Sequence, residues 1–142
     1  MIVLDTNILS ELVRPTPASE VKNWLRHQTD GQVLVTTVIT VSEIEYGLSR
    51  LPSGRRRKEL EERFAALTAA RFYFTVLPLN EEAARLAGRM RGSRESQGLN
   101  AQSADMMIAA ITSLAGASLA TRNVKDFTNA GIDIINPWDL MN

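Results

Sequence analysis

Residues 1–13 read MIVLDTNILSELV, and this stretch predicts how the chain begins to fold. The apolar residues Ile2–Leu4 are expected to form a buried strand. The polar residues 5–7, DTN, end that strand, because Asp and Asn favour turns and helix caps. Helical spacing of apolar residues follows over Ile8–Val13, until two prolines end it. The chain therefore opens with a strand, a polar turn and a short helix.

The rest of the chain repeats this alternation. Four further apolar runs are expected to be strands, at Val33–Ile39, Phe72–Leu77, Ser118–Thr121 and Ile132–Ile135. Helical patterns separate them over 19–25, 40–51, 55–70, 81–94 and 103–115. Ser19 is expected to cap the first of these helices, and Thr40 to open the second. Strands that alternate with helices indicate an α/β protein: a three-layer α/β/α sandwich with a central, mostly parallel five-stranded sheet.

The composition fits one globular domain and excludes several kinds of chemistry. The 142 residues are 44% hydrophobic, near the globular average of about 45–50%. No apolar stretch reaches the roughly 18–20 residues of a membrane helix, and the start lacks the pattern of a signal peptide. There is no cysteine and one histidine, His27, to which we assign no catalytic role. We therefore expect a cytoplasmic protein whose chemistry comes from carboxylates, hydroxyls and arginine.

Arginine dominates the basic residues, although the net charge gives no signal for nucleic acid. Sixteen basic residues balance sixteen acidic ones, and thirteen of the basic ones are arginine, which pairs bidentately with phosphate or carboxylate. The run Arg55–Lys58 is followed by glutamates at helical spacing, so it predicts a solvated helix face. A second group has no acid between its members and is the better candidate to contact a phosphate backbone or an acidic partner. Its members are Arg85, Arg89, Arg91 and Arg94.

Four acidic residues are expected at the same edge of the sheet. Asp5 directly follows the first strand, and Glu43 lies in the first turn of the helix after the second strand. Asp105 lies in the first turn of the helix that begins at Ser103, and Asp126 follows the fourth strand in a turn or short helix. Ligands of open parallel sheets bind beyond the carboxyl ends of the strands. The sequence therefore places the chemistry at this edge.

Each acid alone also has a structural explanation. Asp5 fits an Asx turn or a helix cap. Residues 40–43, TVSE, fit a capping box with Glu43 at the third helical position. Asp105 suits the positive end of a helix dipole, and Asp126 can cap the turn at Phe127. Taken singly, each residue leaves both interpretations open.

The four carboxylates together are harder to explain structurally. Gathered at one edge they repel one another, and burying them without a counter-charge is costly. A hard divalent cation resolves this repulsion, because Mg²⁺ and Mn²⁺ prefer oxygen ligands. Such a site suits phosphoryl chemistry, in which the metal polarises a phosphate and lowers the pKa of a bound water.

Five segments that together span nearly the whole chain resemble a known family. They are MIVLDTNILSEL at 1–12, TTVITVSEIEYGLSRLPSGRRR at 36–57, QSADMMIAA at 102–110, LATRNVKDF at 119–127 and NPWDL at 136–140. In this order the chain resembles a PIN-domain ribonuclease of the VapC toxin type, close to the fast-intracellular-trafficking branch. The resemblance implies a single PIN domain over residues 1–142 and an endoribonuclease that depends on Mg²⁺ or Mn²⁺. It also implies a homodimer, a small VapB-like antitoxin as partner, and a larger assembly on DNA through that antitoxin.

The resemblance also implies which residues form the site. Asp5, Glu43 and Asp105 fall on the acidic positions of the family. At the fourth position some members carry an acid where this chain has Asn123, while others match this chain with the acid at Asp126. We assign the fourth position to Asp126 and keep Asn123 as the alternative.

The residues of the site are expected to divide into three roles. Asp5 and Asp105 coordinate metal directly, while Glu43 and Asp126 act through water and position the attacking hydroxide. Supporting hydrogen bonds are expected from Thr6, Asn7, Ser103, Thr121 and Asn123. Contacts to RNA or to the antitoxin are expected from Arg85, Arg89 and Arg91.

Other phosphate-handling classes fit less well. A dehalogenase-like phosphatase needs a second acid where this chain has Asn7, and a receiver domain needs an aspartate near 77–79, which read LPL. No glycine-rich phosphate loop of the dinucleotide or P-loop type occurs. The remaining alternative is a non-catalytic PIN-fold interaction or RNA-binding module, which metal-dependent RNA cleavage would distinguish from a nuclease. The sequence does not name the RNA, because surface shape sets that choice.

Overall fold

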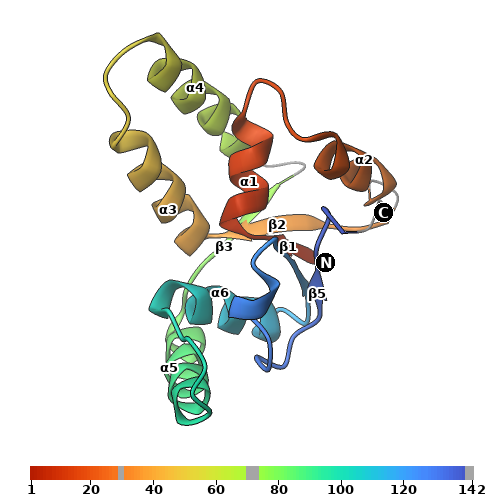
Figure 1. The fold of residues 1–142 in the computed structure, drawn as a ribbon, viewed down its shortest axis with the longest axis vertical. Helices are drawn as coiled ribbons and strands as arrows, with labels where there is room; N and C mark the ends of the chain where they lie inside the picture. Colours follow the sequence, from red (N-terminus) through yellow and green to blue (C-terminus); the bar gives the residue numbers. More distant parts are fainter. Residues whose placement is uncertain (29–30, 70–73, 140–142) are drawn as a thin grey trace.

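A five-stranded parallel sheet forms the centre of the molecule (Figure 1). The computed structural model describes residues 1–28, 31–69 and 74–139. The strands are β1 (Ile2–Leu4), β2 (Leu34–Thr37), β3 (Thr75–Leu77), β4 (Ser118–Ala120) and β5 (Ile134–Ile135). Their order is β3-β2-β1-β4-β5, so the first strand is central. Its Val3 lies beside Val35 of β2 and Leu119 of β4.

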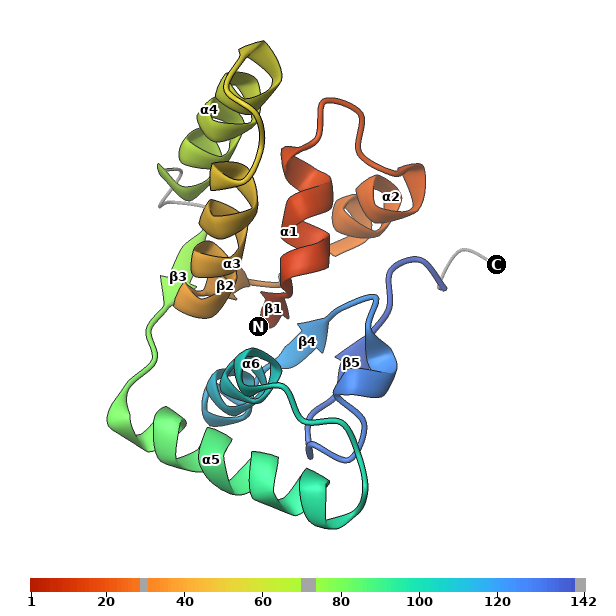
Figure 2. The same ribbon diagram turned by 60° about the vertical axis from the view of Figure 1, so that its left-hand side comes forward.

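Helices cover both faces of the sheet, which confirms the predicted three-layer α/β/α sandwich (Figure 2). The helices in the described part of the chain are α1 (Thr6–Val13), α2 (Ser19–Gln28), α3 (Val38–Ser49), α4 (Arg55–Ala69), α5 (Glu81–Ser96), α6 (Ser103–Leu114) and the 3₁₀ helix η1 (Val124–Asp126). Helices α1 to α4 share one core with the sheet, and α6 packs on the other face with α5 outside it.

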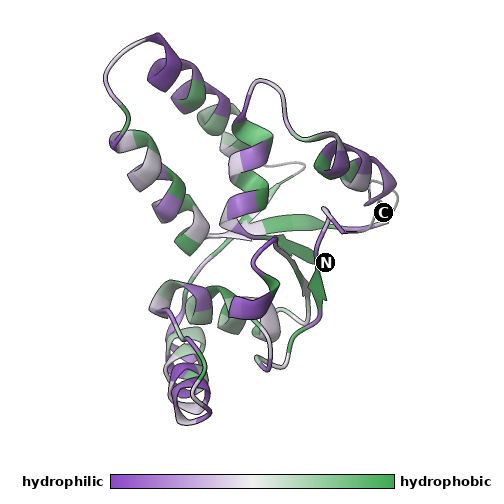
Figure 3. Ribbon diagram, in the orientation of Figure 1, coloured by the Kyte–Doolittle hydropathy of each residue, from purple (hydrophilic) through white to green (hydrophobic). Residues whose placement is uncertain are grey.

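Alternation along β1 divides the core between the two faces. Side chains of a strand point alternately to opposite sides of the sheet. Ile2 and Leu4 therefore pack with Ile8 of α1, while Val3 packs with Ile108 of α6. Figure 3 shows the strands as strongly hydrophobic and the outer end of α4 as hydrophilic. A three-residue strand with both faces buried is thus enough to hold the two helical layers together.

The boundary between β2 and α3 differs from the expected one. The predicted strand Val33–Ile39 is shorter, at Leu34–Thr37, and the helix begins at Val38 rather than at Thr40. Thr37 caps the helix, because its side-chain oxygen accepts a hydrogen bond from the Thr40 N–H at 3.2 Å. The β-branched residues after Thr37 favour strands by composition. They are helical here because the Thr37 cap stabilises the start of a helix at this point.

Several other boundaries also differ by a few residues. Ser19, the expected cap, is instead the first residue of α2. The third strand begins at Thr75 rather than at 72, and positions 72–73 of that expected strand lie outside the described residues. The fifth strand is limited to Ile134–Ile135, shorter than the expected 132–135. In the parts of the chain that the structure describes, no helix combines the length and hydrophobicity needed to cross a bilayer.

Replacing Ile108 by Ala is expected to lower the free energy of unfolding by about 2–5 kcal/mol. Ile108 is 0% exposed between α6 and the sheet, so the substitution leaves a cavity. Leu114→Ala, at the 44% exposed end of the same helix, is the matched control and should cost about 1 kcal/mol or less. Urea unfolding measures both, and equal losses would contradict the assigned core.

Candidate active site

Asp5 is the most buried acid at the carboxyl edge of the sheet, with only 3% of its surface exposed. It directly follows β1 and caps α1, since its Oδ1 accepts the Thr6 N–H at 2.8 Å. Its Oδ2 accepts the hydroxyl of Thr121 at 2.7 Å and the side-chain amide of Asn7 at 3.4 Å. Burial raises the pKa of Asp5, with a smaller upward contribution from Glu43, while the hydrogen bonds from Thr121, Thr6 and Asn7 oppose the rise. One oxygen of the Asp5 carboxylate therefore caps α1, while the other accepts bonds from side chains at the candidate site.

Glu43 is held beside Asp5 by Thr6. The Thr6 hydroxyl donates to Glu43 Oε1 at 2.7 Å, and its backbone N–H donates to Asp5. One threonine thus links the carboxylates that follow β1 and β2. The capping-box explanation for Glu43 is wrong, because the helix is capped by Thr37 and Glu43 lies beyond its first turn.

Thr121 and Asn7 join the end of β4 to the end of β1. Thr121 is fully buried, and its hydroxyl accepts the side-chain amide of Asn7 at 3.2 Å and the backbone N–H of Asn123 at 3.0 Å. Asn7 Oδ1 in turn accepts the backbone N–H of Arg122 at 3.1 Å. The loop that leads to Asp126 is therefore tied to the residues around Asp5.

Asp105 lies within electrostatic reach of Asp5, Glu43 and Asp126. Asp105 is half-buried in the first turn of α6, and Asp126 is half-buried at the end of η1. Burial, and then the charges of Asp5, Asp126 and Glu43, raise the pKa of Asp105 from 3.8 to about 6, while Arg94 lowers it. The structure thus brings the four predicted acids near one another, with Asp105 under the influence of the other three.

The side chains gathered here suit a hard divalent cation as ligands, but they do not surround an ion on all sides. Every side-chain donor gathered here is an oxygen or an amide, as Mg²⁺ and Mn²⁺ prefer. Burial and, after it, the charges of three nearby acids raise the pKa of Asp105, and a bound cation would offset both effects. Among the described residues, no three acidic or histidine side chains converge into a ready-made ligand cluster. This looser spacing fits an ion that keeps several waters beside one or two carboxylates.

Two other predicted site residues make no side-chain hydrogen bond to this network in the described chain. The Ser103 hydroxyl accepts a hydrogen bond from Arg91 Nη1 at 2.8 Å and is exposed. Asn123 contributes its backbone N–H, and its exposed side chain forms no cap bond for η1. The structure therefore brings Thr6, Asn7 and Thr121 together around Asp5 and leaves these two at the margin.

The second arginine group is more strongly paired than its sequence suggests. Arg85 pairs with Glu81 and Arg91 with Glu95, both four residues apart along α5, at 3.2 and 3.1 Å. The group has no acid between its members, as the sequence shows, but acids just before and just after it pair with two of its arginines. In the first run, Arg57 pairs with Glu61 as expected, at 2.6 Å.

Arg94 is the one member of the group that turns into the core, where it is 2% exposed. Its burial was missed because arginine is rarely buried, yet a signal was present. Ala83, Ala87, Met90 and Arg94 follow helical spacing, and the first two are buried while Met90 packs against the core. This spacing places Arg94 on the inward face of α5.

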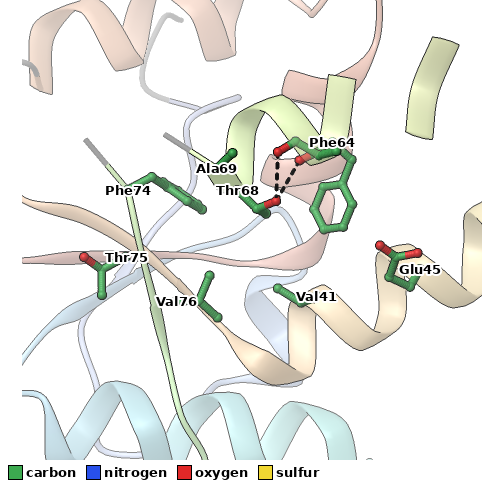
Figure 4. A pocket seen from close by; sticks show the side chains of 9 residues that line it. Val41, Glu45, Phe64, Thr68, Ala69, Phe74, Thr75 and Val76 are labelled. Carbon is green, nitrogen blue, oxygen red and sulfur yellow. Dashed lines mark hydrogen bonds between the residues drawn. The ribbon is translucent and has the colours of Figure 1, made fainter. Parts of the chain in front are cut away.

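A separate hollow lies between α3, α4 and β3 (Figure 4). Phe64, Phe74, Val41 and Val76 line it, and the Thr68 hydroxyl there is bound to the Phe64 carbonyl at 3.0 Å. Among the described residues that line it, Glu45 is the single ionisable one. The described part of the lining therefore lacks the converging polar groups of an active site.

The chain belongs to the PIN-domain family, whose family model matches residues 2–132. Among named relatives, it is 36% identical over 142 residues to the VapC ribonuclease Y4jK of Sinorhizobium fredii, which covers 98% of this chain and 99% of the relative. It is 33% identical to the toxin FitB of Neisseria gonorrhoeae, and the match covers 97% of this chain and 99% of that relative. The family resemblance inferred from the sequence is confirmed.

Solved structures agree with these relatives. The crystal structure of FitAcB from Neisseria gonorrhoeae matches with a TM-score of 0.83 and 33% identity, over 99% of this chain and 100% of that one. VapBC2 of Rickettsia felis matches with a TM-score of 0.80 over 96% of this chain and 98% of that one, at 21% identity, which shows the fold alone.

Asp105→Asn is expected to stabilise the metal-free chain at neutral pH. Because the pKa of Asp105 is raised from 3.8 to about 6, the folded state binds this proton more tightly than the unfolded state does. The free energy of unfolding therefore falls as pH rises from about 4 to about 6, and stays reduced above. With solvent screening of this half-buried group, the gain for Asp105→Asn at neutral pH is about 1 kcal/mol.

Urea unfolding in EDTA at about pH 4 and about pH 7 measures this gain, which should appear only at the higher pH. Asp133→Asn, at an exposed position outside the site, is the control. A similar gain in the control, or none in Asp105→Asn, would show that charge at the site does not oppose folding.

Proposed function

We propose that this chain is the toxin of a type II toxin–antitoxin pair and acts as a metal-dependent endoribonuclease. The observation that carries this proposal is the placement of four carboxylates near the carboxyl edge of the sheet, where burial and the charges of the other three raise the pKa of Asp105 to about 6. A structural cap gains nothing from such repulsion, whereas a cation site requires the negative charge. The relatives named as a VapC ribonuclease and a toxin support the same conclusion.

The proposed metal is Mg²⁺, with Mn²⁺ as an alternative. Asp5 and Asp105 would ligate it directly, and Glu43 and Asp126 would act through water. When bound, the ion polarises a phosphate and lowers the pKa of a coordinated water, so that the scissile RNA phosphodiester can be attacked in line. The all-oxygen donor set supports this assignment.

The protein's own residues would keep the carboxylates ionised and oriented. Thr121, Thr6 and Asn7 donate hydrogen bonds to Asp5, and such bonds favour its charged form. The same Thr6 orients Glu43, so this carboxylate can hold the attacking water and take up its proton. Asp126 is the proposed fourth acid, with Asn123 the alternative at the rim of the site. Ser103 keeps only a marginal supporting role in this scheme.

The proposed partners are a VapB-like antitoxin and an RNA substrate, with the toxin itself a homodimer. Support comes from the solved complexes of similar proteins. FitAB bound to the IR36 DNA fragment matches with a TM-score of 0.84 at 32% identity, over 100% of this chain and 99% of that one. By analogy, this chain would join a larger assembly on DNA through its antitoxin.

Cleavage of structured RNAs by the purified chain should require Mg²⁺ or Mn²⁺ and stop in EDTA. Asp5→Asn should fold and lose activity by more than the roughly 10- to 100-fold that follows loss of a group supporting a ligand. Asp126→Asn should lose activity similarly if Asp126 is the fourth acid. Gel analysis of a panel of transfer, ribosomal and messenger RNAs measures these effects.

Each outcome of that experiment has a definite meaning. Full activity in Asp5→Asn would refute the site. Cleavage that survives Asp126→Asn would assign the fourth position to Asn123, or leave three acids sufficient. No metal-dependent cutting of any RNA by the wild-type chain would favour the non-catalytic RNA-binding or interaction module.

Arg89 is the member of the α5 group best placed to meet an RNA backbone. It is exposed, and the described contacts give it no ion pair, whereas Arg85 and Arg91 have glutamate partners. Arg89→Gln, in an Asp5→Asn background that cannot cut, should weaken RNA binding. The slope of log affinity against log salt should shrink by about 0.7 for one lost phosphate contact. Arg63→Gln on exposed α4 is the control, and an unchanged slope in Arg89→Gln would remove α5 from the RNA interface.

A further inference from the structure

Arg94 is a buried cation whose charge is satisfied by backbone. It lies in the last turn of α5 and is 2% exposed. Burying a guanidinium is costly unless hydrogen bonds or opposite charge replace its water. The partners of Arg94 in the described chain are carbonyl oxygens and not carboxylates. Such a costly arrangement calls for a reason beyond filling space.

The guanidinium binds two separate segments at once. Its Nε donates to the Asn100 carbonyl at 2.8 Å, in the loop between α5 and α6. Its Nη1 donates to the Thr128 carbonyl, and its Nη2 to the Lys125 carbonyl at 3.3 Å. The planar fork of arginine donates to these three acceptors from three separate nitrogens, whereas lysine would have to reach all of them from a single nitrogen.

Both segments lead directly to a proposed site acid. The loop through Asn100 enters α6, which carries Asp105 in its first turn. Lys125 precedes Asp126 in η1, and Phe127 beyond it is 1% exposed in the core below. In the part of the chain that the structure describes, neither the Asp105 nor the Asp126 carboxylate shares in the hydrogen-bond network around Asp5. Their spacing must therefore be set by the backbone segments that carry them.

We infer that Arg94 is a positioning residue, which fixes the separation of Asp105 and Asp126 by holding both segments on one guanidinium. Its effects on catalysis and on metal affinity rest on the proposed function, while its effect on the two segments does not. The positive charge of Arg94 also acts on the Asp105 carboxyl, so it partly balances the acids without ligating an ion.

Arg94→Met keeps an apolar stem as far as the position of Nε and removes the guanidinium fork. Amide hydrogen exchange over 99–101 and 123–130 should become at least about tenfold faster than in the wild type, with the strands unchanged. Mn²⁺ binding, measured by calorimetry without RNA, should weaken by about 10-fold or more. In RNA cleavage, kcat should fall more than KM changes. Arg63→Met on exposed α4 is the control and should match the wild type in all three.

A double-mutant cycle separates positioning from a general loss of stability. If Arg94 acts through Asp126, Arg94→Met should weaken Mn²⁺ binding much less when Asp126 is already Asn. Full additivity of the two losses would overturn the inference. So would wild-type exchange rates over 123–130 in Arg94→Met, since the fork would then hold nothing in place.

Two further measurements keep the inference testable if Arg94→Met fails to fold. Arg94→Lys retains the charge and cannot bridge all three carbonyls, so full recovery of exchange and Mn²⁺ affinity in it would overturn the bridging role. In the wild-type chain, the Arg94 Nε–H should give a resolved, slowly exchanging NMR signal, and rapid exchange would likewise overturn it. If the wild type cuts no RNA, the nuclease proposal fails while exchange and Mn²⁺ binding still decide this one.

Discussion

The Asp5 carboxylate is the group on which the arrangement of this molecule depends. It ends the central strand, caps the first helix and receives the hydroxyl of Thr121 from the end of β4. Without partners in the interior, such a carboxylate would take up a proton and become neutral. Here three donors offset part of the cost of burial, so the pKa of Asp5 is raised less than burial alone would raise it. The strand order that places β4 beside β1 therefore also brings one of these donors, Thr121, to the buried acid.

Much of this could be predicted from the sequence. The alternation of apolar runs and helical spacing identifies all five strands and the layers around them, since both patterns follow directly from burial. The acids at strand ends are visible for the same reason: parallel strands bring their carboxyl ends to one edge. Thr6 and Thr121 could be named as supporting residues, although which oxygen each one meets could not.

The parts that sequence reasoning missed depend on competition between local and tertiary effects. The residues after Thr37 favour a strand by composition, but the hydroxyl of Thr37 starts a helix there. Arg94 resembles part of a basic surface, because a charged residue is not expected to continue the apolar spacing of its neighbours. The carbonyls that bind its guanidinium come from loops elsewhere in the sequence. Arg85 and Arg91 do have glutamate partners, which lie just outside the second arginine group.

The site then consists of two halves that are fixed by different means. Around Asp5 and Glu43, side-chain hydrogen bonds from Thr6 and Thr121 set the geometry, and loss of either hydroxyl removes the bond it donates. In the described chain the carboxylates of Asp105 and Asp126 accept no such bonds, and the backbone segments that carry them meet on one guanidinium. A cation between the halves would not need to assemble the site from a flexible chain. It would only have to neutralise charges whose positions are already held, and this preorganisation reduces the cost of binding.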